Sequence, residues 1–259
     1  MDLGISGRRA IVCGASRGLG YGCAAALVGE GVDVTIAARN ADALNSAVAA
    51  LNAQGPGKAV GVVADVATEE GRAALLKTCP SPDMLVNNAG GPPPGDFRSW
   101  GRTEWIAALD ANMLSAIELI KATIDPMIER KFGRIVNITS HMVKEPTAML
   151  GLSNGARAGL TGFVGGLARD VAKHGVTVNN LLPGQFDTDR LRSNHAKFAA
   201  RTGGDADQFR ERMRNDVPAK RFGTAEEFGA ACAFLCSRFG GYITGQNLLL
   251  DGGQYRGLM

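Results

Sequence analysis

The stretch that decides the fold is CGASRGLG at 13–20, which follows the apolar run AIVC at 10–13 and opens a segment with helical spacing at 18–30. Because Gly14, Gly18 and Gly20 carry no Cβ atoms, backbone N–H groups and the N-terminus of the following helix can face a pyrophosphate. A glycine-rich turn can also serve only tight packing of helix against strand, but the strand–turn–helix setting favours the phosphate cradle. The sequence therefore predicts a dinucleotide site at this turn.

The same alternation of strand and helix continues to the C-terminus. Short apolar runs predict strands, and longer segments with helical spacing predict the helices between them. Strands that are apolar on nearly every residue are buried on both faces of a sheet. We therefore expect an α/β protein with a single doubly wound Rossmann domain, 1–259, in which a seven-stranded parallel sheet has helices on both faces. The predicted strands are 10–13, 34–38, 59–64, 84–88, 134–139, 177–182 and 247–251, and the predicted helices are 18–30, 41–53, 68–77, 103–130, 153–174 and 225–237.

Composition argues against several other classes of protein. The formal net charge is only +3, and the basic residues do not gather with aromatic ones, so we expect no nucleic acid partner. The five cysteines lack metal-ligand spacing and fit a reducing compartment, so we expect neither a metal nor a disulfide. The N-terminus lacks the pattern of a signal peptide, and no segment holds the roughly 18 apolar residues of a membrane span. We expect a cytoplasmic protein without a membrane partner.

Charges near the end of the second strand indicate which dinucleotide binds. In NAD-binding domains an acidic residue at this place bonds the ribose 2′-hydroxyl, and it would repel a 2′-phosphate. Here the strand ends in Ala37, Ala38 and Arg39, and Arg17 lies inside the glycine turn. Either guanidinium can pair with a 2′-phosphate, although each can also lie along the surface. The sequence favours NADP(H) over NAD(H).

Seven motifs along the whole chain resemble those of the short-chain dehydrogenase/reductase family, in particular its 3-oxoacyl-carrier-protein reductases. They are CGASRGLG at 13–20, ADV at 64–66, NNAG at 87–90, DANML at 110–114, GRIVNITS at 133–140, VTVNNLLPGQFDT at 176–188 and ITGQNLLLDGG at 243–253. The resemblance implies an oxidoreductase that moves a hydride between NADP(H) and a small-molecule carbonyl or alcohol, such as a 3-oxoacyl thioester. It also implies a homotetramer, assembled through the helices 112–130 and 153–174 and the last strand.

The resemblance further implies which residues contact the cofactor. The contacts expected are Gly14, Ser16, Arg17, Gly18, Leu19 and Gly20 in the turn, Asp65 and Val66 at the adenine, Asn88, Ala89 and Gly90 on the adenosine ribose side, and Pro183, Gly184, Phe186 and Thr188 at the nicotinamide carboxamide. Each of them has a structural alternative. Asn87, for example, can simply join neighbouring strands through its amide.

The chain departs from this family at the catalytic pair. Its members use Ser, Tyr and Lys with a supporting Asn, and Ser140 and Asn112 match two of these. Where the Tyr-x-x-x-Lys pair should begin, thirteen residues after the serine, the chain has Ser153-Asn-Gly-Ala-Arg157. A serine hydroxyl is a far weaker acid than tyrosine, and arginine does not titrate near neutrality. Arg157 can nevertheless hold ribose hydroxyls or stabilise a developing oxyanion with its fixed charge.

Two residues just after Ser140 are candidates for a substitute proton donor. Lys144 would need a pKa lowered by burial against the cofactor, and the alternative is a solvated loop lysine. His141 has a useful reference pKa of about 6.5, but its side chain can point away from the site. The sequence leaves both hypotheses open.

A polar insertion at about 185–220 has the place of the family's substrate lid. Its arginines either attract an anionic substrate, such as a carboxylate or a thioester carrier, or form a solvated helix face, and the sequence favours the second. They are Arg190, Arg192, Arg201, Arg210, Arg212 and Arg214.

Three functions remain open at this point. The first is hydride transfer with Ser140, Asn112, Ser153 and Arg157 in altered roles. The second is an isomerase or lyase that polarises a carbonyl without net hydride transfer. The third is a regulator that binds NADP(H) without turnover, which the loss of the Tyr–Lys pair favours and the retention of Ser140 and Asn112 opposes.

Overall fold

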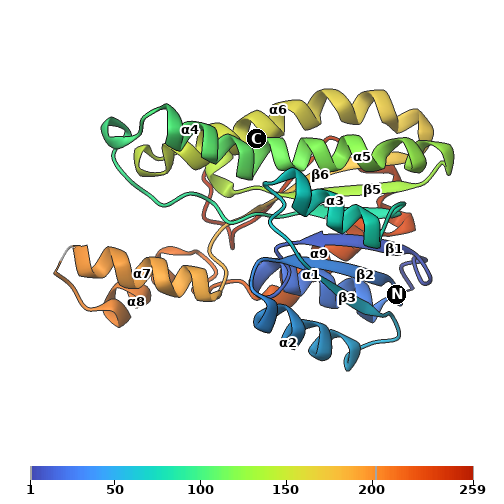
Figure 1. Cartoon of the computed structure of the whole chain (residues 1–259). Helices are drawn as coiled ribbons and strands as arrows, with labels where there is room; N and C mark the ends of the chain where they lie inside the picture. The colour runs from blue at the N-terminus through green and yellow to red at the C-terminus, as the bar shows by residue number, and fades with distance from the viewer. Residues whose placement is uncertain (1, 202, 259) are drawn as a thin grey trace.

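One parallel sheet of seven strands forms the centre of the protein, in the order β3-β2-β1-β4-β5-β6-β7 (Figure 1). The structure is a computed structural model that describes residues 2–201 and 203–258, apart from the side chain of Arg201. All seven predicted strands are present, and the predicted fold class is confirmed. The strands are β1 (Arg9–Cys13), β2 (Asp33–Ala38), β3 (Ala59–Val63), β4 (Met84–Asn87), β5 (Gly133–Ile138), β6 (Val176–Pro183) and β7 (Asn247–Leu250).

Helices cover both faces of the sheet, and each face has its own hydrophobic core. On one face α1 (Gly18–Gly29), α2 (Ala41–Asn52) and α9 (Ala225–Cys236) pack with residues such as Leu27, Leu44 and Phe228. On the other face α3 (Glu69–Thr78), α5 (Ser115–Glu129) and α6 (Gly151–Val171) contribute, for example, Leu75, Leu119 and Leu160. Figure 1 shows these two layers below and above the strands. In the described part of the chain, no helix has both the length and the apolar character needed to cross a membrane.

The predicted helix 103–130 is interrupted, and this differs from our expectation. It consists of α4 (Arg102–Leu109), a π-helical segment η2 (Asp110–Leu114) and α5. The wider turn places Asn112 in the interior, where its Nδ2 atom donates to the carbonyls of Ala108 at 3.3 Å and Gly90 at 3.4 Å. Such π-turns are frequent at functional sites. Helical periodicity is recognised over a window longer than this single wide turn, so the sequence pattern did not reveal the interruption.

A row of four asparagines, of which the first three are buried, joins four neighbouring strands of the sheet. Asn87 donates to Asn137 at 2.9 Å, Asn137 to Asn180 at 3.2 Å, and Asn180 to Asn247 at 2.8 Å. Each pair lies directly opposite in the strand register. The expectation that Asn87 joins strands is therefore confirmed. Because buried amides must be paired, the row fixes the register of the strands that end at the site.

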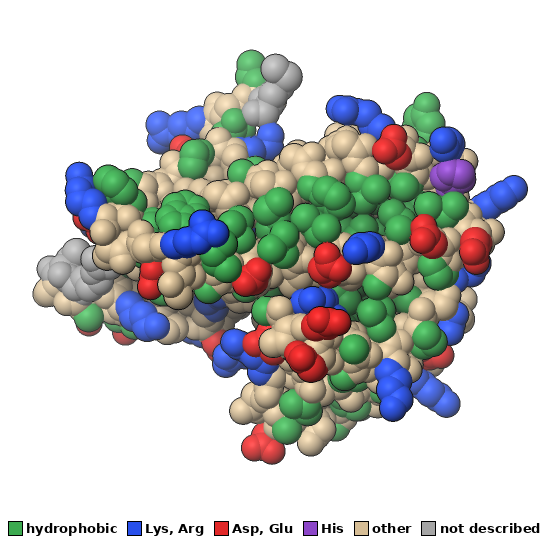
Figure 2. Space-filling model, turned by 45° about the horizontal axis from the view of Figure 1, so that its top comes forward, with side chains coloured by type: hydrophobic (Ala, Val, Ile, Leu, Met, Phe, Trp, Pro, Cys, Tyr) green, Lys and Arg blue, Asp and Glu red, His purple; other side chains and the backbone are tan. Residues whose placement is uncertain are grey.

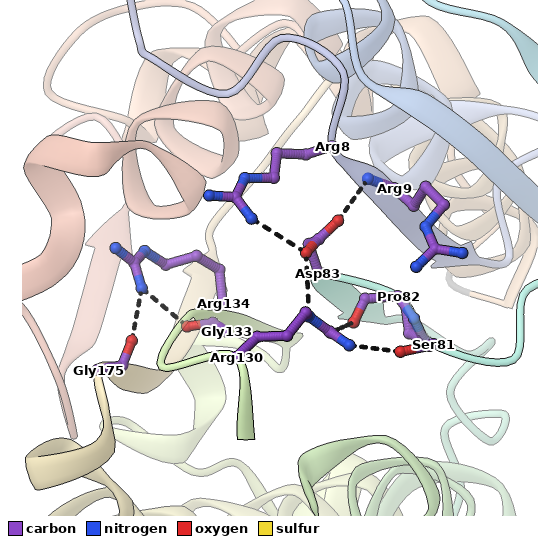
Figure 3. A network of polar contacts seen from close by, with 9 residues as sticks. All are labelled: Arg8, Arg9, Ser81, Pro82, Asp83, Arg130, Gly133, Arg134 and Gly175. Atoms are coloured by element: carbon purple, nitrogen blue, oxygen red, sulfur yellow. Dashed lines mark hydrogen bonds and ion pairs between the residues drawn. The ribbon is translucent and has the colours of Figure 1, made fainter. Parts of the chain in front are cut away.

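The opposite edge of the sheet is held by a network of arginines (Figure 3). The buried carboxylate of Asp83 pairs with Arg8 at 3.2 Å and with Arg130 at 3.4 Å. Arg134 is also buried, and its Nη1 atom donates to the carbonyl of Gly175 at 3.0 Å. In open parallel sheets ligands bind beyond the carboxyl ends of the strands, so this network serves the fold.

Two helices fill the segment where the sequence predicts a lid. They are α7 (Asp189–Arg201) and α8 (Ala206–Asp216), and they project from the body of the molecule (Figure 1). The buried ring of His195 lies 5.5 Å from the ring of Phe209 and 5.7 Å from that of Phe222, and so holds the pair together. Both helices lie inside the segment 185–220, and its role as a lid stays a prediction.

Candidate active site

The glycine turn has the conformation that a phosphate cradle requires. Gly14 and Gly18 have φ angles of +58° and +62°, which disfavour any residue with a Cβ atom. A Cβ atom on Gly20 would stand 2.4 Å from the carbonyl oxygen of Gly14. The N-terminus of α1 has no side-chain cap at Arg17 and no acidic residue in its first turn. Its open N–H groups and partial positive charge therefore suit a dinucleotide diphosphate.

The segment after β4 supports this turn and the neighbouring helices. Asn88 donates from Nδ2 to the carbonyl of Gly14 at 3.1 Å, and so braces the glycine turn. The carbonyls of Ala89 and Gly90 accept hydrogen bonds from Arg157 and Asn112. These contacts position the segment, and the expected cofactor contacts of the same residues stay predictions.

Basic side chains lie at the ends of the first two strands, where the 2′-phosphate is expected. Arg17 is exposed at the start of α1, and Arg39 follows β2 with 78% of its side chain exposed. Arg39 lies 3.6 Å from a carboxylate oxygen of Asp65, whose other oxygen accepts from the N–H of Ala67 at 3.0 Å. Val66 follows directly, and its carbonyl accepts from Arg72 at 2.9 Å. An exposed ion pair of this kind is weak, so Arg39 remains available to a stronger anion.

At the end of β6 lie three of the residues expected at the nicotinamide carboxamide. The N–H of Gly184 donates to Leu250 at 2.8 Å, and a Cβ atom on Gly18 would lie 3.5 Å from the methyl group of Thr188. Thr188 thus lies beside the glycine turn, and its expected contact with the nicotinamide carboxamide stays a prediction. The ring of Phe186, however, is 6% exposed and packs edge-on against Phe228 at 5.2 Å. Its side chain belongs to the core, which leaves only its backbone for a cofactor.

Ser153 and Arg157 form a pair on the first turns of α6. The Nε atom of Arg157 donates to the Oγ atom of Ser153 at 3.2 Å, across the i,i+4 spacing of the helix. Because the serine oxygen accepts this bond, its own hydrogen is free to point toward a ligand. The two residues that replace the expected Tyr–Lys pair therefore remain connected to each other.

Arg157 also ties together the ends of two strands. Its Nη1 atom donates to the carbonyls of Ile138 at 2.7 Å and Thr139 at 2.8 Å, and its Nη2 atom donates to the carbonyl of Ala89 at 3.3 Å. Burial, together with the smaller effect of the charge of Arg190, lowers the pKa of Arg157 to about 10. The guanidinium is thus a fixed cation at neutral pH, held by neutral carbonyls.

The residues after β5 have separate partners. The Oγ atom of Ser140 accepts from the N–H of Met142 at 3.2 Å at the start of η3 (His141–Val143), so its hydroxyl can donate elsewhere. The Nδ1 atom of His141 lies 3.0 Å from the carbonyl oxygen of Pro183, which requires a proton on Nδ1. The ammonium of Lys144 lies 5.4 Å from the centre of the Tyr255 ring, within cation–π range. Neither His141 nor Lys144 is thereby assigned as a proton donor, and both hypotheses stay predictions.

Two residues near Ser153 were not among the predicted site residues. Arg190, in the first turn of α7, donates from Nη2 to the carbonyl of Gly91 at 2.9 Å. Gly91 follows the NNAG motif and lies close to Arg157 and Ser153. The sequence contained a signal for Arg190, because it is one of the lid arginines, but its spacing did not separate it from the other five.

Comparisons with known proteins agree with this architecture. The enoyl-(acyl carrier protein) reductase family model matches residues 14–254. The chain is 31% identical to the NADPH-dependent reductase BacG of Bacillus subtilis, over 98% of this chain and 100% of that protein. It is 33% identical to the 3-oxoacyl-[acyl-carrier-protein] reductase FabG of Salmonella typhimurium, over 98% and 99%. L-sorbose reductase from Gluconobacter frateurii, solved with NADPH and L-sorbose, superposes with a TM-score of 0.94 at 29% identity, covering 100% of both chains.

Proposed function

The chain belongs to the short-chain dehydrogenase/reductase family of oxidoreductases, and from this premise we propose that it is an NADPH-dependent carbonyl reductase in which Ser153 and Arg157 replace the usual tyrosine and lysine. One observation carries the proposal. A half-buried guanidinium stands at the position where the motif spacing expects the lysine, and it hydrogen-bonds the hydroxyl at the position expected for the tyrosine. This contact keeps a cation beside a hydroxyl at the expected reaction centre.

The proposed cofactor is NADP(H), and this agrees with both the charges and the relatives. Arg17 and Arg39 border the expected 2′-phosphate position, and the strand ends without an acidic residue. BacG is named as NADPH-dependent, and the sorbose reductase was solved with NADPH. When bound, NADPH supplies a hydride to the carbonyl carbon of the substrate and becomes NADP⁺.

The protein's own contribution is to stabilise the oxygen that gains negative charge. The hydroxyls of Ser153 and Ser140 donate to this oxygen, while the nearby charge of Arg157 lowers the energy of the alkoxide. Because neither serine releases a proton readily, the alkoxide takes its final proton from solvent. Asn112, held in the π-turn, keeps the segment after β4 in place through its bond to Gly90. The reaction thus depends on a fixed cation and not on a titrating tyrosine.

We propose that the protein acts as a homotetramer. Figure 2 shows hydrophobic side chains gathered on the face that carries α5 and α6, where such side chains would be covered by another copy. Leu114, which directly precedes α5, is 43% exposed, and Ile106 on α4 is 42% exposed. Light scattering on the purified protein tests this, and a monomeric mass contradicts it.

The activity is tested by incubating the purified protein with NADPH and a panel of ketones, aldehydes, oxo acids and 3-oxoacyl thioesters. We expect oxidation of NADPH at 340 nm together with formation of one equivalent of alcohol. Conversion of a substrate without NADPH oxidation supports the isomerase or lyase alternative and contradicts the proposal. Binding of NADPH, measured by fluorescence, without any conversion supports the regulator.

A further inference from the structure

Three polar atoms converge on one point beside Gly91. The position that a Cβ atom would take on this glycine lies 3.1 Å from Nη2 of Arg190, 3.5 Å from Nη2 of Arg157 and 3.6 Å from Oγ of Ser153. Arg190 comes from the lid helix α7, whereas Ser153 and Arg157 come from α6. Residues from two separate elements therefore aim donors at the same small region, which borders the catalytic pair.

The two guanidinium groups at this point have no carboxylate partner in the described part of the chain. Arg157 donates only to Ser153 and to backbone carbonyls, and Arg190 donates to the carbonyl of Gly91. Their charges repel, since Arg190 acts to lower the pKa of Arg157. Two neighbouring cations without an anion are unfavourable, and a bound anion would relieve the repulsion.

Two other arginines of the lid differ from Arg190, because they form ion pairs within the lid segment. Arg192 pairs with Asp187 and Asp189, and Arg210 also pairs with Asp187 at 2.8 Å. The charges of both arginines are therefore paired with carboxylates inside the lid segment. Arg190 is exposed to solvent but points to the site, so it is accessible to a ligand.

We propose that Arg190 and Arg157 bind the carboxylate of an anionic substrate, and that the enzyme reduces short 2-oxo or 3-oxo carboxylic acids. Arg190 offers several N–H groups in the planar arrangement that matches a carboxylate. Four of the five N–H groups of Arg157 already have acceptors in the protein, so it contributes mainly charge. Because Ser153 borders the same point, the carbonyl that it contacts must lie only a few bonds from the carboxylate. This inference rests on the proposed function, because it concerns the same site.

The test compares each oxo acid with its methyl ester, which keeps the carbonyl and removes the charge. The probes are acetoacetate with methyl acetoacetate, and 2-oxobutyrate with methyl 2-oxobutyrate. Wild type, Arg190→Met and Arg190→Lys are assayed for kcat/KM with NADPH. Arg192→Met is the matched control, since it removes the same charge from the same helix but from an ion-paired position.

A second readout does not require turnover. Calorimetric titration of acetoacetate into protein saturated with NADP⁺ measures substrate binding alone, because no hydride is present. Fluorescence titration measures the Kd for NADPH in each variant. The fold of each variant is checked by its thermal melting.

We expect wild type to prefer the acid of at least one pair over its ester. In Arg190→Met the kcat/KM for that acid falls roughly 10- to 100-fold, as expected for a lost charge-assisted bond, and its binding weakens equally. In the same variant, the kcat/KM for the ester and the Kd for NADPH change by less than about twofold. The kcat/KM of Arg190→Lys for the acid is intermediate, and that of Arg192→Met resembles wild type.

Two results would overturn the inference. One is reduction of uncharged ketones or both esters in preference to the acids, which leaves the reductase proposal intact. The other is weaker NADPH binding in Arg190→Met with an unchanged ratio of acid to ester, which assigns the guanidinium to the cofactor's phosphates. Binding of acetoacetate that depends on Arg190, without turnover of any carbonyl, instead upholds the anion site and contradicts the reductase.

Discussion

Arg157 donates from Nε to the hydroxyl oxygen of Ser153 at 3.2 Å, one helical turn away, and the remaining bonds of this guanidinium go to backbone carbonyls. The arrangement keeps a positive charge beside a hydroxyl whose proton is free to donate. It therefore combines a hydrogen-bond donor and a fixed cation at the position where a substrate oxygen becomes an alkoxide.

Replacing Ser153 by alanine should slow the chemical step while the fold is kept. Loss of one donor to a developing oxyanion typically lowers kcat by about 100-fold or more. The lost bond to Arg157 should lower the melting temperature by no more than about 4 °C. Steady-state kinetics and thermal melting measure the two effects. Ser46→Ala, which removes a hydroxyl on the exposed helix α2, is the control and should leave kcat unchanged; equal kcat in Ser153→Ala and wild type would exclude the role.

The dependence of activity on pH should differ from that of a reaction with a titrating acid. The pKa of Arg157 in the folded protein is lowered to about 10, mainly because burial desolvates the guanidinium. The guanidinium is charged below this pKa, so we expect kcat to be constant from about pH 6 to about pH 9 and to fall above about pH 10. A kcat that changes tenfold per pH unit anywhere between pH 6 and 9 would show that another group supplies the proton.

The same pKa has a consequence for stability. Because the unfolded chain keeps a proton on Arg157 up to a higher pH than the folded chain, this group makes the free energy of unfolding rise with pH above about 10, until the ordinary pKa of arginine is passed. Arg157 therefore opposes folding at neutral pH through its buried charge. This fits a residue retained for the site.

Gly20→Ala should weaken cofactor binding by disturbing the glycine turn. The new methyl group would stand 2.4 Å from the carbonyl oxygen of Gly14, so the backbone of the turn must shift. We expect the Kd for NADPH, measured by fluorescence, to rise at least about tenfold. Gly29→Ala is the matched control on the same helix, because its Cβ atom would have no heavy atom within 4 Å. If both variants bind NADPH like wild type, the turn is not the phosphate cradle.

Arg39→Ser should change the choice between cofactors. Removal of one guanidinium from the 2′-phosphate should lower kcat/KM with NADPH roughly 10-fold or more and leave that with NADH nearly unchanged. Lys58→Ser, which removes an exposed cation just before β3, should alter neither value. A ratio of NADPH to NADH use that stays constant in Arg39→Ser would assign the 2′-phosphate to other residues.

Much of the fold could be predicted from the sequence, because the strands coincide with short apolar runs. The seven predicted strands and the alternation of helices are confirmed, and in the central strands burial on both faces leaves an apolar pattern that requires no tertiary information. The π-helical interruption at Asp110–Leu114 could not be predicted, because a single wide turn is too short to change the helical periodicity of the whole segment.

The site could be predicted in part. Motif spacing identified Ser153 and Arg157 as the residues in the catalytic positions, but it gave no means to foresee that they bond each other or that Arg157 joins two strand ends. In the sequence, nothing distinguished Arg190 from the other arginines of the lid. Only the folded chain, which pairs Arg192 with carboxylates and brings Arg190 to Gly91, separates them.

The central claim is that Ser153 and Arg157 act as one unit, and a double-mutant cycle tests it most directly. The measured quantity is kcat for NADPH-dependent carbonyl reduction by wild type, Ser153→Ala, Arg157→Gln and the double variant, each with its melting temperature. We predict that the double variant is no slower than Arg157→Gln by more than about twofold, because residues that act as a unit are strongly non-additive. If the two losses in kcat multiply in the double variant, the residues act independently and the account is contradicted.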